Sequence, residues 1–516
     1  MPAFATAAAA NDPTAFALVD DRGEFTWAEV GDALNRCANN LLAIDLGEAR
    51  RVAIFAENAA EVALAHLGAL IAGASSVPVN FHLTTDEAEY ILTDSATRVL
   101  FVGPETAERG IAAARASGVP TVVAWRCGDL CDGTTVIDWE QWLASADPAD
   151  PPTDLAPRPN LLYTSGTTGR PKGTELPPTM FAGGGSIDEH LEALKQNSFV
   201  PFGTHLVVGP MYHTGPLSGM RLLAAGVPSV ILGRFDAEAT LAAIDRYRAG
   251  SSVMVPTHFV RMLALPDDVK TRYDVSSMQM LAHTGAKCPV DVKRSMIEWF
   301  GPVFRDSYGA TEVGTVCTIS SEEWLEHPGS VGRSVPPFTA VILDDDLNEL
   351  PPNTEGPLYF RDDTGRGIVY PNDPEKTAAA NPAPGLFTLG EIGYIDDDGY
   401  VFITDRFSDM VVSGGANLYP AEAEQVLIDH PQVADCACIG VPHDEMGEEL
   451  RALVIPVAGS NIDVGELSAW MRERLTTMKC PRSYVLVGDL QRNTMGKINK
   501  RRLRDAYLAG ELPVVG

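Results

Sequence analysis

Basic side chains are scarce in this chain. Its 516 residues hold 39 lysines and arginines against 69 aspartates and glutamates, which gives a formal net charge of −30 at pH 7. A chain this acidic repels nucleic acids and anionic membrane surfaces unless it carries a local basic patch. Because the hydrophobic content of 45% is that of an ordinary globular protein, we interpret the charge as a contribution to solubility.

Paired cysteines are also missing. The chain has eight cysteines, and none of them forms a Cys-x-x-Cys pair. Cys127 and Cys131 lack a second pair or nearby histidines, so a zinc site is not expected. Scattered cysteines in a chain of this length are typical of reduced thiols in a cytoplasmic protein.

Marks of targeting and membrane insertion are lacking as well. Residues 1–10 contain no basic side chain, so no signal peptide is expected. The most apolar helical stretch, residues 62–79, is interrupted by a histidine, two glycines and a proline. This stretch is therefore not expected to span a membrane.

A loop dense in hydroxyl groups, glycines and cations follows the apolar pair at 161–162. Residues 163–173 read Tyr-Thr-Ser-Gly-Thr-Thr-Gly-Arg-Pro-Lys-Gly. Glycines let the backbone approach an anion closely, Ser and Thr add donors, and Lys172 supplies charge. The loop is predicted to hold a nucleotide phosphate rather than to be a solvated turn. It is not a Walker A loop, because Pro171 and Gly173 flank the lysine where glycine and Ser/Thr are required.

Strand-like and helix-like segments alternate from residue 24 onward. Thr26 is expected to cap a helix whose solvent-exposed face carries Asp32, Asn35 and Asn39. Buried strands are expected in the first half of the chain at 51–55, 76–79, 99–102, 122–125, 206–210, 229–232 and 252–255. With helices between them, these strands predict an α/β domain with a mostly parallel sheet.

The pattern changes in the last third of the chain. Residues 331–361 read as short strands and turns, and a hairpin around an Asp-Gly turn ends near 406. A new series of strands and helices follows. We therefore expect a domain at 1–406 that includes a β-rich subdomain, a hinge at 406–409 and an α+β domain at 409–516.

Four further segments could carry chemistry. His213, in an apolar turn after a strand, suits a catalytic residue, a gate on a pocket or a buried core histidine. The small-residue turn at 282–286 can accept a flat ring. Tyr308 and Glu312 suit stacking on a base and holding a hard cation. Near the C-terminus, Lys497 follows a glycine just before a helix, which displays it on a turn.

Taken together and in this order, the segments resemble the adenylate-forming superfamily, which includes acyl-CoA synthetases, peptide-synthetase adenylation domains and beetle luciferases. The resemblance runs from about residue 24 to residue 506. It implies a large N-terminal domain of mixed and parallel sheets flanked by helices, with a β-rich subdomain, and a small mobile α+β C-terminal domain. It leaves a homodimer open as the assembly.

The resemblance also implies roles for individual residues. Lys497 and His213 are the candidates for catalysis, and Glu312 with Thr164 the candidates for holding Mg²⁺. The residues expected to bind ATP or to follow the hinge are Thr164, Ser165, Gly166, Thr167, Thr168, Gly169, Lys172, Thr284, Gly285, Ala286, Tyr308, Gly309, Thr311, Glu312, Glu391, Arg406, Ser413, Gly414 and Gly415.

Two positions depart from the family pattern. The position expected to bind ribose is usually aspartate and here is Glu391, which can still accept two hydroxyl groups. The hinge position, usually aspartate or lysine, is Ser408, which should still permit domain rotation.

The reaction implied is ATP-dependent activation of a carboxylic acid, with Mg²⁺ as cofactor and CoA as co-substrate, as in fatty acid metabolism. Tyr212 and His213 stand where amino-acid-activating relatives carry an acidic residue, which disfavours an amino acid. Residues 211–219 and 255–263 suit a fatty or aryl acid. Transfer to a separate carrier protein, a luciferase-like oxygenase and a non-catalytic sensor remain as alternatives, of which the sensor is disfavoured because Lys497 and Glu312 are both present.

Overall fold

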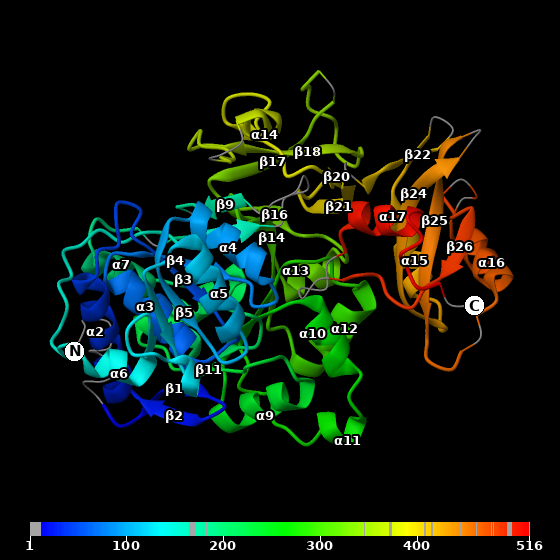
Figure 1. Cartoon of the computed structure of the whole chain (residues 1–516). Coiled ribbons are helices and arrows are strands. Elements are labelled where there is room, and N and C mark those ends of the chain that lie inside the picture. Colours follow the sequence, from blue (N-terminus) through cyan, green and yellow to red (C-terminus); the bar gives the residue numbers. More distant parts are fainter. Residues whose placement is uncertain are drawn as a thin grey trace.

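The computed structural model describes most of the chain. It covers residues 12–164, 172–178, 180–181, 183–344, 346–370, 374–406, 409–413, 416–443, 446–460, 462–475, 477, 479–492 and 498–514. Figure 1 shows a large N-terminal part, coloured from blue to yellow, with a smaller C-terminal unit in orange and red beside it. The described strands form one nine-stranded sheet, three five-stranded sheets and a two-stranded hairpin.

The first five-stranded sheet is parallel throughout and has the order β4-β3-β5-β6-β7. Side chains alternate between its faces, so that Val99 and Phe101 point into one core while Leu100 and Val102 point into another. Helices cover both faces, as a parallel sheet requires. The elements are β3 (Arg51–Phe55), α3 (Ala60–Ile71), β4 (Ser75–Val79), α4 (Thr85–Asp94), β5 (Thr97–Val102), α5 (Ala107–Ser117), β6 (Thr121–Ala124), η1 (Gly128–Leu130), β7 (Val136–Asp138) and α6 (Trp139–Ala144).

The nine-stranded sheet has the order β16-β15-β14-β13-β12-β10-β11-β1-β2. Its strands pair in parallel from β14 to β1, whereas β2, β15 and β16 add antiparallel edges. Its elements are β1 (Phe16–Asp20), β2 (Gly23–Thr26), α2 (Trp27–Ala43), α7 (Ile187–Leu194), η2 (Val200–Phe202), β10 (His205–Val207), α8 (Thr214–Met220), η3 (Arg221–Ala225), β11 (Ser229–Ile231), α9 (Ala237–Tyr247), β12 (Ser251–Met254), α10 (Pro256–Leu263), α11 (Asp267–Lys270), β13 (Met280–His283), α12 (Val290–Phe300), β14 (Phe304–Ala310), β15 (Gly314–Ser320), α13 (Ser321–Glu326) and β16 (Arg333–Ser334).

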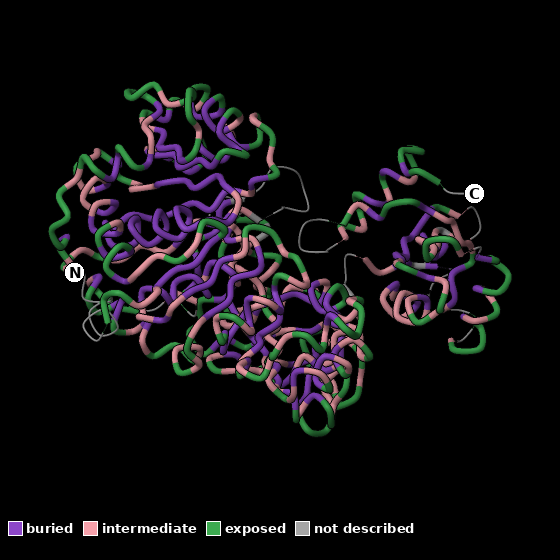
Figure 2. Tube along the Cα trace, turned by 90° about the horizontal axis from the view of Figure 1, so that it is seen from below, coloured by how far each residue is buried: buried purple, intermediate pink, exposed green. Residues whose placement is uncertain are grey.

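Both sheets share one core. The cluster that contains Val99 of β5 also contains Val207 of β10 and Ile231 of β11, together with apolar residues of α2 and α3. Separate clusters cover the outer faces, one with α4 and α5 and one with α9, α10 and α12. The predicted α/β class is confirmed, in an α-β-α-β-α arrangement whose interior is buried (Figure 2).

Helix α3 lies inside this arrangement and is buried on all sides. A helix that is apolar around its whole circumference belongs in the core of a large protein or in a membrane. Among the described residues, no helix is long and apolar enough to cross a membrane.

The predicted β-rich subdomain forms a sheet of order β17-β18-β20-β21, with β19 beside β18. The expected hairpin is its edge, β20 and β21, joined around Gly399, which has a positive φ of 83°. The elements are β17 (Phe338–Ile342), β18 (Gly356–Asp362), α14 (Pro374–Ala380), β19 (Leu386–Phe387), β20 (Glu391–Ile395) and β21 (Val401–Arg406).

The C-terminal unit has its own sheet, of order β23-β22-β25-β24 with β26 beside β25, and its own apolar clusters on both faces. Helix α15 also contacts β21 of the N-terminal part. Residues 407–408 lie outside the described residues, so the division at 406–409 stays a prediction. The elements are β22 (Val411–Ser413), β23 (Ala416–Leu418), α15 (Pro420–Ile428), β24 (Val433–His443), β25 (Gly447–Pro456), α16 (Val464–Arg474), β26 (Ser483–Leu486) and α17 (Lys500–Leu508).

The prediction that Asp32, Asn35 and Asn39 lie on a solvent-exposed face of α2 was wrong in part. Asp32 is exposed, but Asn35 is only 4% exposed and donates a hydrogen bond from Nδ2 to the carbonyl of Pro148, at 2.8 Å. Asn39 donates in the same way to the carbonyl of Asp147, at 2.8 Å. A side-chain amide can form hydrogen bonds with the peptide groups of a segment that crosses its helix. Nothing in the sequence close to these asparagines indicates that such a segment crosses there.

Candidate active site

The predicted phosphate loop connects the two strands of a small hairpin, β8 (Leu161–Thr164) and β9 (Lys172–Glu175). The strands are antiparallel, and Thr164 lies directly opposite Lys172. The loop residues Ser165, Gly166, Thr167, Thr168 and Gly169 lie outside the described residues, as do the side chains of Thr164 and Lys172. The structure therefore places both ends of the loop, and the roles of these residues stay predictions.

The base of this hairpin is anchored to the five-stranded sheet. The Tyr163 hydroxyl donates a hydrogen bond to Asp94 of α4, at 2.7 Å. Burial, and then the neighbouring Asp94 carboxylate, raise the pKa of Tyr163, so this phenol stays protonated and continues to donate. Gly173 lies close to the Leu161 and Tyr163 side chains, which a Cβ atom would meet at 3.2 and 3.3 Å.

The two segments expected to bracket adenine lie side by side. The turn Thr284, Gly285 and Ala286 follows β13, and Tyr308 lies on β14, which pairs in parallel with β13. Gly285 has a positive φ of 90°, a conformation that glycine adopts without strain. The carboxyl ends of adjacent parallel strands are where α/β sheets bind ligands.

Gly309 permits a close crossing of two strands at this place. A Cβ atom there would lie 1.9 Å from the Gly314 carbonyl oxygen of β15, so no larger residue fits without moving the backbone. Tyr308 is held beside Phe360 of the β-rich subdomain, with ring centroids 6.3 Å apart. The aromatic ring is thus positioned by two different sheets.

Thr311 and Glu312 lie in the turn between β14 and β15. The Glu312 carbonyl accepts a hydrogen bond from Arg366 Nη1, at 3.3 Å, which holds the backbone of the turn. The described residues contain no group of three or more His, Cys, Asp or Glu side chains that could hold a metal ion by themselves. Mg²⁺ needs only one or two carboxylates when substrate phosphates supply further oxygens, so the half-buried Glu312 fits such a role.

The two residues expected to meet the ribose are neighbours across a hairpin. Glu391 begins β20, Arg406 ends β21, and the two residues pair directly in the antiparallel ladder. Glu391 is 6% exposed, while the side chain of Arg406 lies outside the described residues. The sequence predicted both residues but not that they share one register position.

His213 is the residue immediately before α8. Its carbonyl accepts the first hydrogen bond of that helix, from Leu217 at 3.0 Å, and its ring lies 4.2 Å from that of Tyr212. Helix α8 lies against the adenine turn, since a Cβ atom on Gly215 would come 3.9 Å from Thr284 Cγ2. The structure thus brings His213 near this turn, and whether it acts in catalysis stays a prediction.

One buried cluster was missed by sequence reasoning. Lys293 of α12, with only 1% of its side chain exposed, forms an ion pair with Asp306 of β14 and lies 4.6 Å from the ring centre of Trp324. His283 of β13 points Nε2 to the same carboxylate, at 2.5 Å. Burial lowers the pKa of Lys293, against the opposing effect of Asp306. No short motif unites these residues, which only the parallel pairing of β13 and β14 brings together.

This cluster lies beneath the two segments expected to bracket adenine. His283 precedes Thr284 by one residue, and Asp306 precedes Tyr308 by two. His283 and Asp306 are also direct partners in the ladder between β13 and β14. The cluster therefore joins three elements beneath the residues expected to contact the base.

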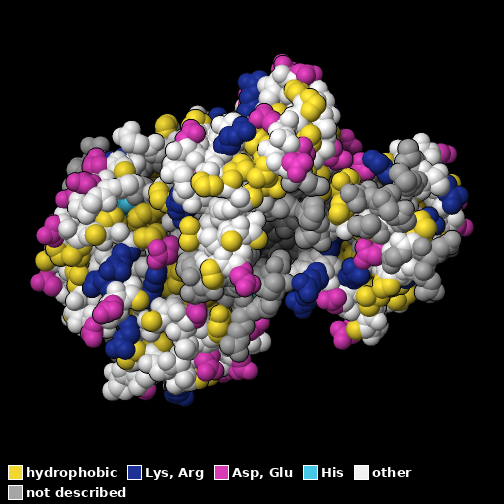
Figure 3. All heavy atoms as spheres, turned by 90° about the horizontal axis from the view of Figure 1, so that it is seen from above, with side chains coloured by type: hydrophobic (Ala, Val, Ile, Leu, Met, Phe, Trp, Pro, Cys, Tyr) yellow, Lys and Arg dark blue, Asp and Glu magenta, His cyan; other side chains and the backbone are white. Residues whose placement is uncertain are grey.

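The C-terminal unit contributes the remaining predicted residues. Ser413 ends β22 and is buried, whereas Gly414, Gly415 and Lys497 lie outside the described residues. On one side of the segment that carries Lys497, Arg492 forms an ion pair with Asp435, Nε to Oδ2 at 2.6 Å. On the other side α17 begins with Lys500, so both ends of this segment are anchored. The surface is hollowed between the N-terminal part and the C-terminal unit (Figure 3).

Comparison with known proteins finds curated relatives that match this chain over nearly its whole length. A feruloyl-CoA synthase from Amycolatopsis sp is 33% identical over 502 residues, covering 96% of either chain. A long-chain-fatty-acid–CoA ligase, FadD13, from Mycobacterium tuberculosis is 32% identical over 499 residues, covering 94% of this chain and 93% of the relative. Among solved structures, ATP-bound MatB from Rhodopseudomonas palustris is 29% identical with a TM-score of 0.79, covering 97% of either chain.

Two family models match the chain in the order of its two parts. The model described as AMP-binding enzyme matches residues 5–367, and the model described as AMP-binding enzyme C-terminal domain matches residues 422–497. The first match covers the phosphate loop, the adenine segments and Glu312, and the second ends at Lys497. The chain therefore belongs to the AMP-binding enzyme family, as its resemblance to the adenylate-forming superfamily predicted.

Proposed function

We infer that the chain is an ATP-dependent acid–CoA ligase that activates an apolar aryl or fatty carboxylic acid. The acid and ATP give an acyl-adenylate and pyrophosphate, and CoA then takes the acyl group and releases AMP. The observation that carries this proposal is the match of both family models, in order, over one chain. The relatives act on such acids by their names, feruloyl and long-chain fatty acyl.

The first step is an in-line attack of the acid's carboxylate on the α-phosphorus of ATP. Thr164 and Lys172 stand at the two ends of the loop proposed to hold the phosphates, and Lys497 is proposed to reach both the α-phosphate and the carboxylate. Positive charge there reduces the repulsion between the two anions and stabilises the charge that develops in the transition state. Bound Mg²⁺, held by Glu312 with Thr164, would neutralise further phosphate charge.

Two neighbouring segments orient the nucleotide. Tyr308 and the turn that begins at Thr284 are proposed to bracket adenine, because they lie on adjacent strands above a buried ion pair. Glu391 and Arg406 are proposed to meet the ribose hydroxyl groups, because they are direct partners in the hairpin. Orientation of this kind lowers the entropy that must be lost in the transition state.

The acid is proposed to lie between α8 and α10. Both helices approach Gly209, where a Cβ atom would come 2.7 Å from Pro216 Cγ of α8 and 4.0 Å from His258 Cε1 of α10. Phe235 stacks on His258 with ring centroids 4.0 Å apart. Apolar and aromatic walls of this kind suit an acid with a hydrophobic body. His213, at the start of α8, is proposed as the residue between this wall and the adenylate.

The proposal also assigns separate roles to the N-terminal and C-terminal domains. Residues 1–406 would form the adenylation domain and residues 409–516 a mobile C-terminal domain that brings Lys497 to the site. Its support is the change of sheet between β21 and β22 and the separate apolar clusters of the C-terminal unit. Ser408, at the hinge, would permit the rotation.

The test is an assay of the whole chain with ATP, Mg²⁺ and a panel of ferulate, indoleacetate, palmitate and malonate, with and without CoA. Pyrophosphate, AMP and acyl-CoA are measured, the last by mass spectrometry. We expect acyl-CoA from an aryl or fatty acid and not from malonate, and a loss of about 10²–10³-fold in adenylate formation for Lys497→Ala. Arg502→Ala, which removes an exposed cation of α17, is the matched control.

Three outcomes would change the proposal. Adenylate that forms without any transfer to CoA would favour a separate carrier protein as the acceptor. Light or oxygen uptake with an acyl-adenylate would favour the luciferase-like reaction. Activity on malonate alone would overturn the apolar acid.

A further inference from the structure

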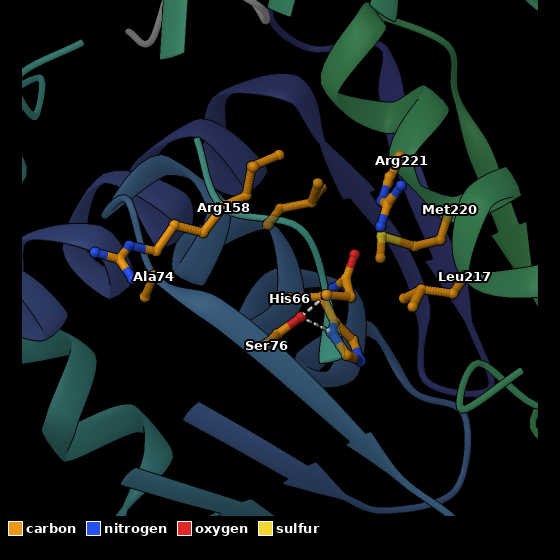
Figure 4. Close-up of a pocket in the computed structure, with 10 residues that line it drawn as sticks. His66, Ala74, Ser76, Arg158, Leu217, Met220 and Arg221 are labelled. Atoms are coloured by element: carbon orange, nitrogen blue, oxygen red, sulfur yellow. Dashed lines mark hydrogen bonds between the residues drawn. The ribbon is translucent and has the colours of Figure 1, made fainter. Parts of the chain in front are cut away.

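A small cavity lies between the two large sheets, beside α8. Its walls come from α3, β4, the segment before β8, and the α8–η3 helices, and include His66, Ser76, Asn160, Met220 and Arg221. Its volume is about 10 Å³, which is room for one small species only. Figure 4 shows the Arg221 guanidinium pointing from η3 toward His66 and Ser76.

Arg221 is a buried cation that forms no ion pair with any residue the structure describes. It is 6% exposed, and its Nη2 has no hydrogen-bond partner among the described residues. Nη1 lies 3.5 Å from the Met180 carbonyl, and the guanidinium lies 5.6 Å from the ring centre of Phe181. Burial lowers the pKa of Arg221 to about 10, so the side chain is still charged at neutral pH.

The polar walls formed by His66, Ser76 and Asn160 are neutral. Asn160 donates a hydrogen bond from Nδ2 to Ser76 Oγ, and Ser76 Oγ lies 2.8 Å from His66 Nδ1. Burial and then the Arg221 charge lower the pKa of His66 to about 3, so this ring is neutral at pH 7. The described residues that line the cavity include a second cation, Arg158, and no Asp or Glu, so both charged residues of the lining are cations.

We propose that this cavity binds one small monovalent anion of the halide class, held by the guanidinium of Arg221. A buried charge is strongly destabilising unless an opposite charge or several hydrogen bonds compensate for it. A water molecule would fill the cavity and accept a hydrogen bond, but it would leave the charge uncompensated. The size of the cavity excludes phosphate and larger carboxylates.

The anion would join parts of the chain that lead to the phosphate loop. Arg221 follows α8, which carries His213 at its start, and Ser76 lies on β4. The adjacent Ser75 donates a hydrogen bond to the Pro159 carbonyl, at 2.5 Å, just before the hairpin that presents the loop. Binding at Arg221 would therefore stabilise the docking of the two sheets beneath that hairpin.

The direct test is crystallography of the whole chain with bromide as the only halide. We expect an anomalous bromide peak within hydrogen-bond distance of Arg221 Nη2 in the wild type, and no peak in Arg221→Gln. Water alone at this place in bromide-containing crystals would overturn the proposal. This outcome is independent of enzymatic activity.

A solution test compares thermal unfolding in sodium chloride or bromide with unfolding in sodium gluconate at equal ionic strength. We expect a saturable rise in Tm of about 1–3 °C with halide in the wild type, because the anion binds only the folded state. Arg221→Gln should lose the rise, while Arg246→Gln, which removes an exposed cation, should keep it. An equal rise in Arg221→Gln would assign the effect to general salt action and overturn the site.

Discussion

The five-stranded and nine-stranded sheets are built alike, yet only the second carries residues expected to contact ATP. Each has parallel strands buried on both faces and covered by helices. The five-stranded sheet stays parallel to both edges, whereas the nine-stranded sheet changes to antiparallel pairing at β14 and β15. Thr284, Tyr308 and Glu312 all lie at this change.

The difference indicates where a parallel sheet becomes a binding site. Parallel strands need crossover connections that carry the chain back across the sheet, whereas an antiparallel turn returns immediately. The tight turn after β14 keeps Glu312 at the same end of the sheet as the small-residue turn after β13. The five-stranded sheet, by contrast, contributes support, through β4 and α4, to the base of the phosphate-loop hairpin.

The strongest test of this comparison removes the buried cation beneath the adenine segments. Lys293→Met should lower the free energy of unfolding by about 3–5 kcal/mol, the cost of leaving a buried charge without its partner, and should raise KM for ATP. Urea unfolding and initial rates measure the two effects. Lys270→Met, which breaks a pair with the exposed Asp267, should cost about 0–1 kcal/mol.

A second substitution shows whether Lys293→Met destabilises the protein because Asp306 loses its partner or because the fold is disrupted. In the double variant Lys293→Met/Asp306→Asn both charges are gone, so part of the stability should return. If Lys293→Met were as stable as the wild type, the cluster would have no supporting role.

The corresponding test on the five-stranded sheet creates a cavity in the apolar core beside it. Leu100 of β5 is fully buried, and Leu100→Ala should lower the free energy of unfolding by about 2–5 kcal/mol. KM for ATP should stay unchanged, because no residue expected to contact ATP lies on this strand. A rise in KM comparable with that of Lys293→Met would show that the two sheets are equally coupled to the site, against the comparison.

A smaller effect is expected at the ribose pair. Glu391→Ala should raise KM for ATP by about 10–100-fold, because hydrogen bonds to a charged group contribute about 1.5–3 kcal/mol. Glu391→Asp restores the residue usual in the family and should stay within a few-fold of the wild type. Glu355→Ala, an exposed acid of the same subdomain, is the control. Unchanged KM in Glu391→Ala would remove this residue from the nucleotide site.

The smallest effect concerns acid stability, to which both sheets contribute equally. His66 of α3 contacts Ser76, and His205 of β10 contacts Ser251 at 2.9 Å. Burial lowers the pKa of either histidine to about 3 from 6.5. The unfolded state therefore binds more protons below pH 6.5, so stability is complete above that pH and is lost as pH falls toward 3.

Each histidine should lower the free energy of unfolding by about 1.4 kcal/mol for each unit by which the pH falls below 6.5. Urea unfolding at pH 7.5 and 5.5 measures the slope, and His205→Gln should reduce it by one histidine's share. A slope that His205→Gln does not alter would contradict the assignment.

Much of this organisation could be predicted from the sequence, because it is local. The strand at 51–55 has the predicted bounds, and Thr26 forms the expected cap, in which its side chain accepts a hydrogen bond from the backbone of Glu29. The phosphate loop could be proposed from the sequence because its glycines and hydroxyl groups stand next to one another in the chain.

What the sequence could not predict depends on contacts between distant segments. The burial of Asn35 depends on a segment more than a hundred residues away, and the pairing of His283 with Asp306 depends on how β13 and β14 align. The direct pairing of Glu391 with Arg406 depends on a register shift within the hairpin. Such relations are set by tertiary packing and leave no periodic pattern.

The shared core between the two large sheets has a consequence for how the molecule unfolds. Because side chains of both sheets and of α3 occupy one apolar cluster, neither sheet can be exposed without opening the other. The two should therefore melt as a single cooperative unit, whereas the C-terminal unit, with clusters of its own, can open independently. The rotation proposed for residues 409–516 would then leave the packing between the two large sheets intact.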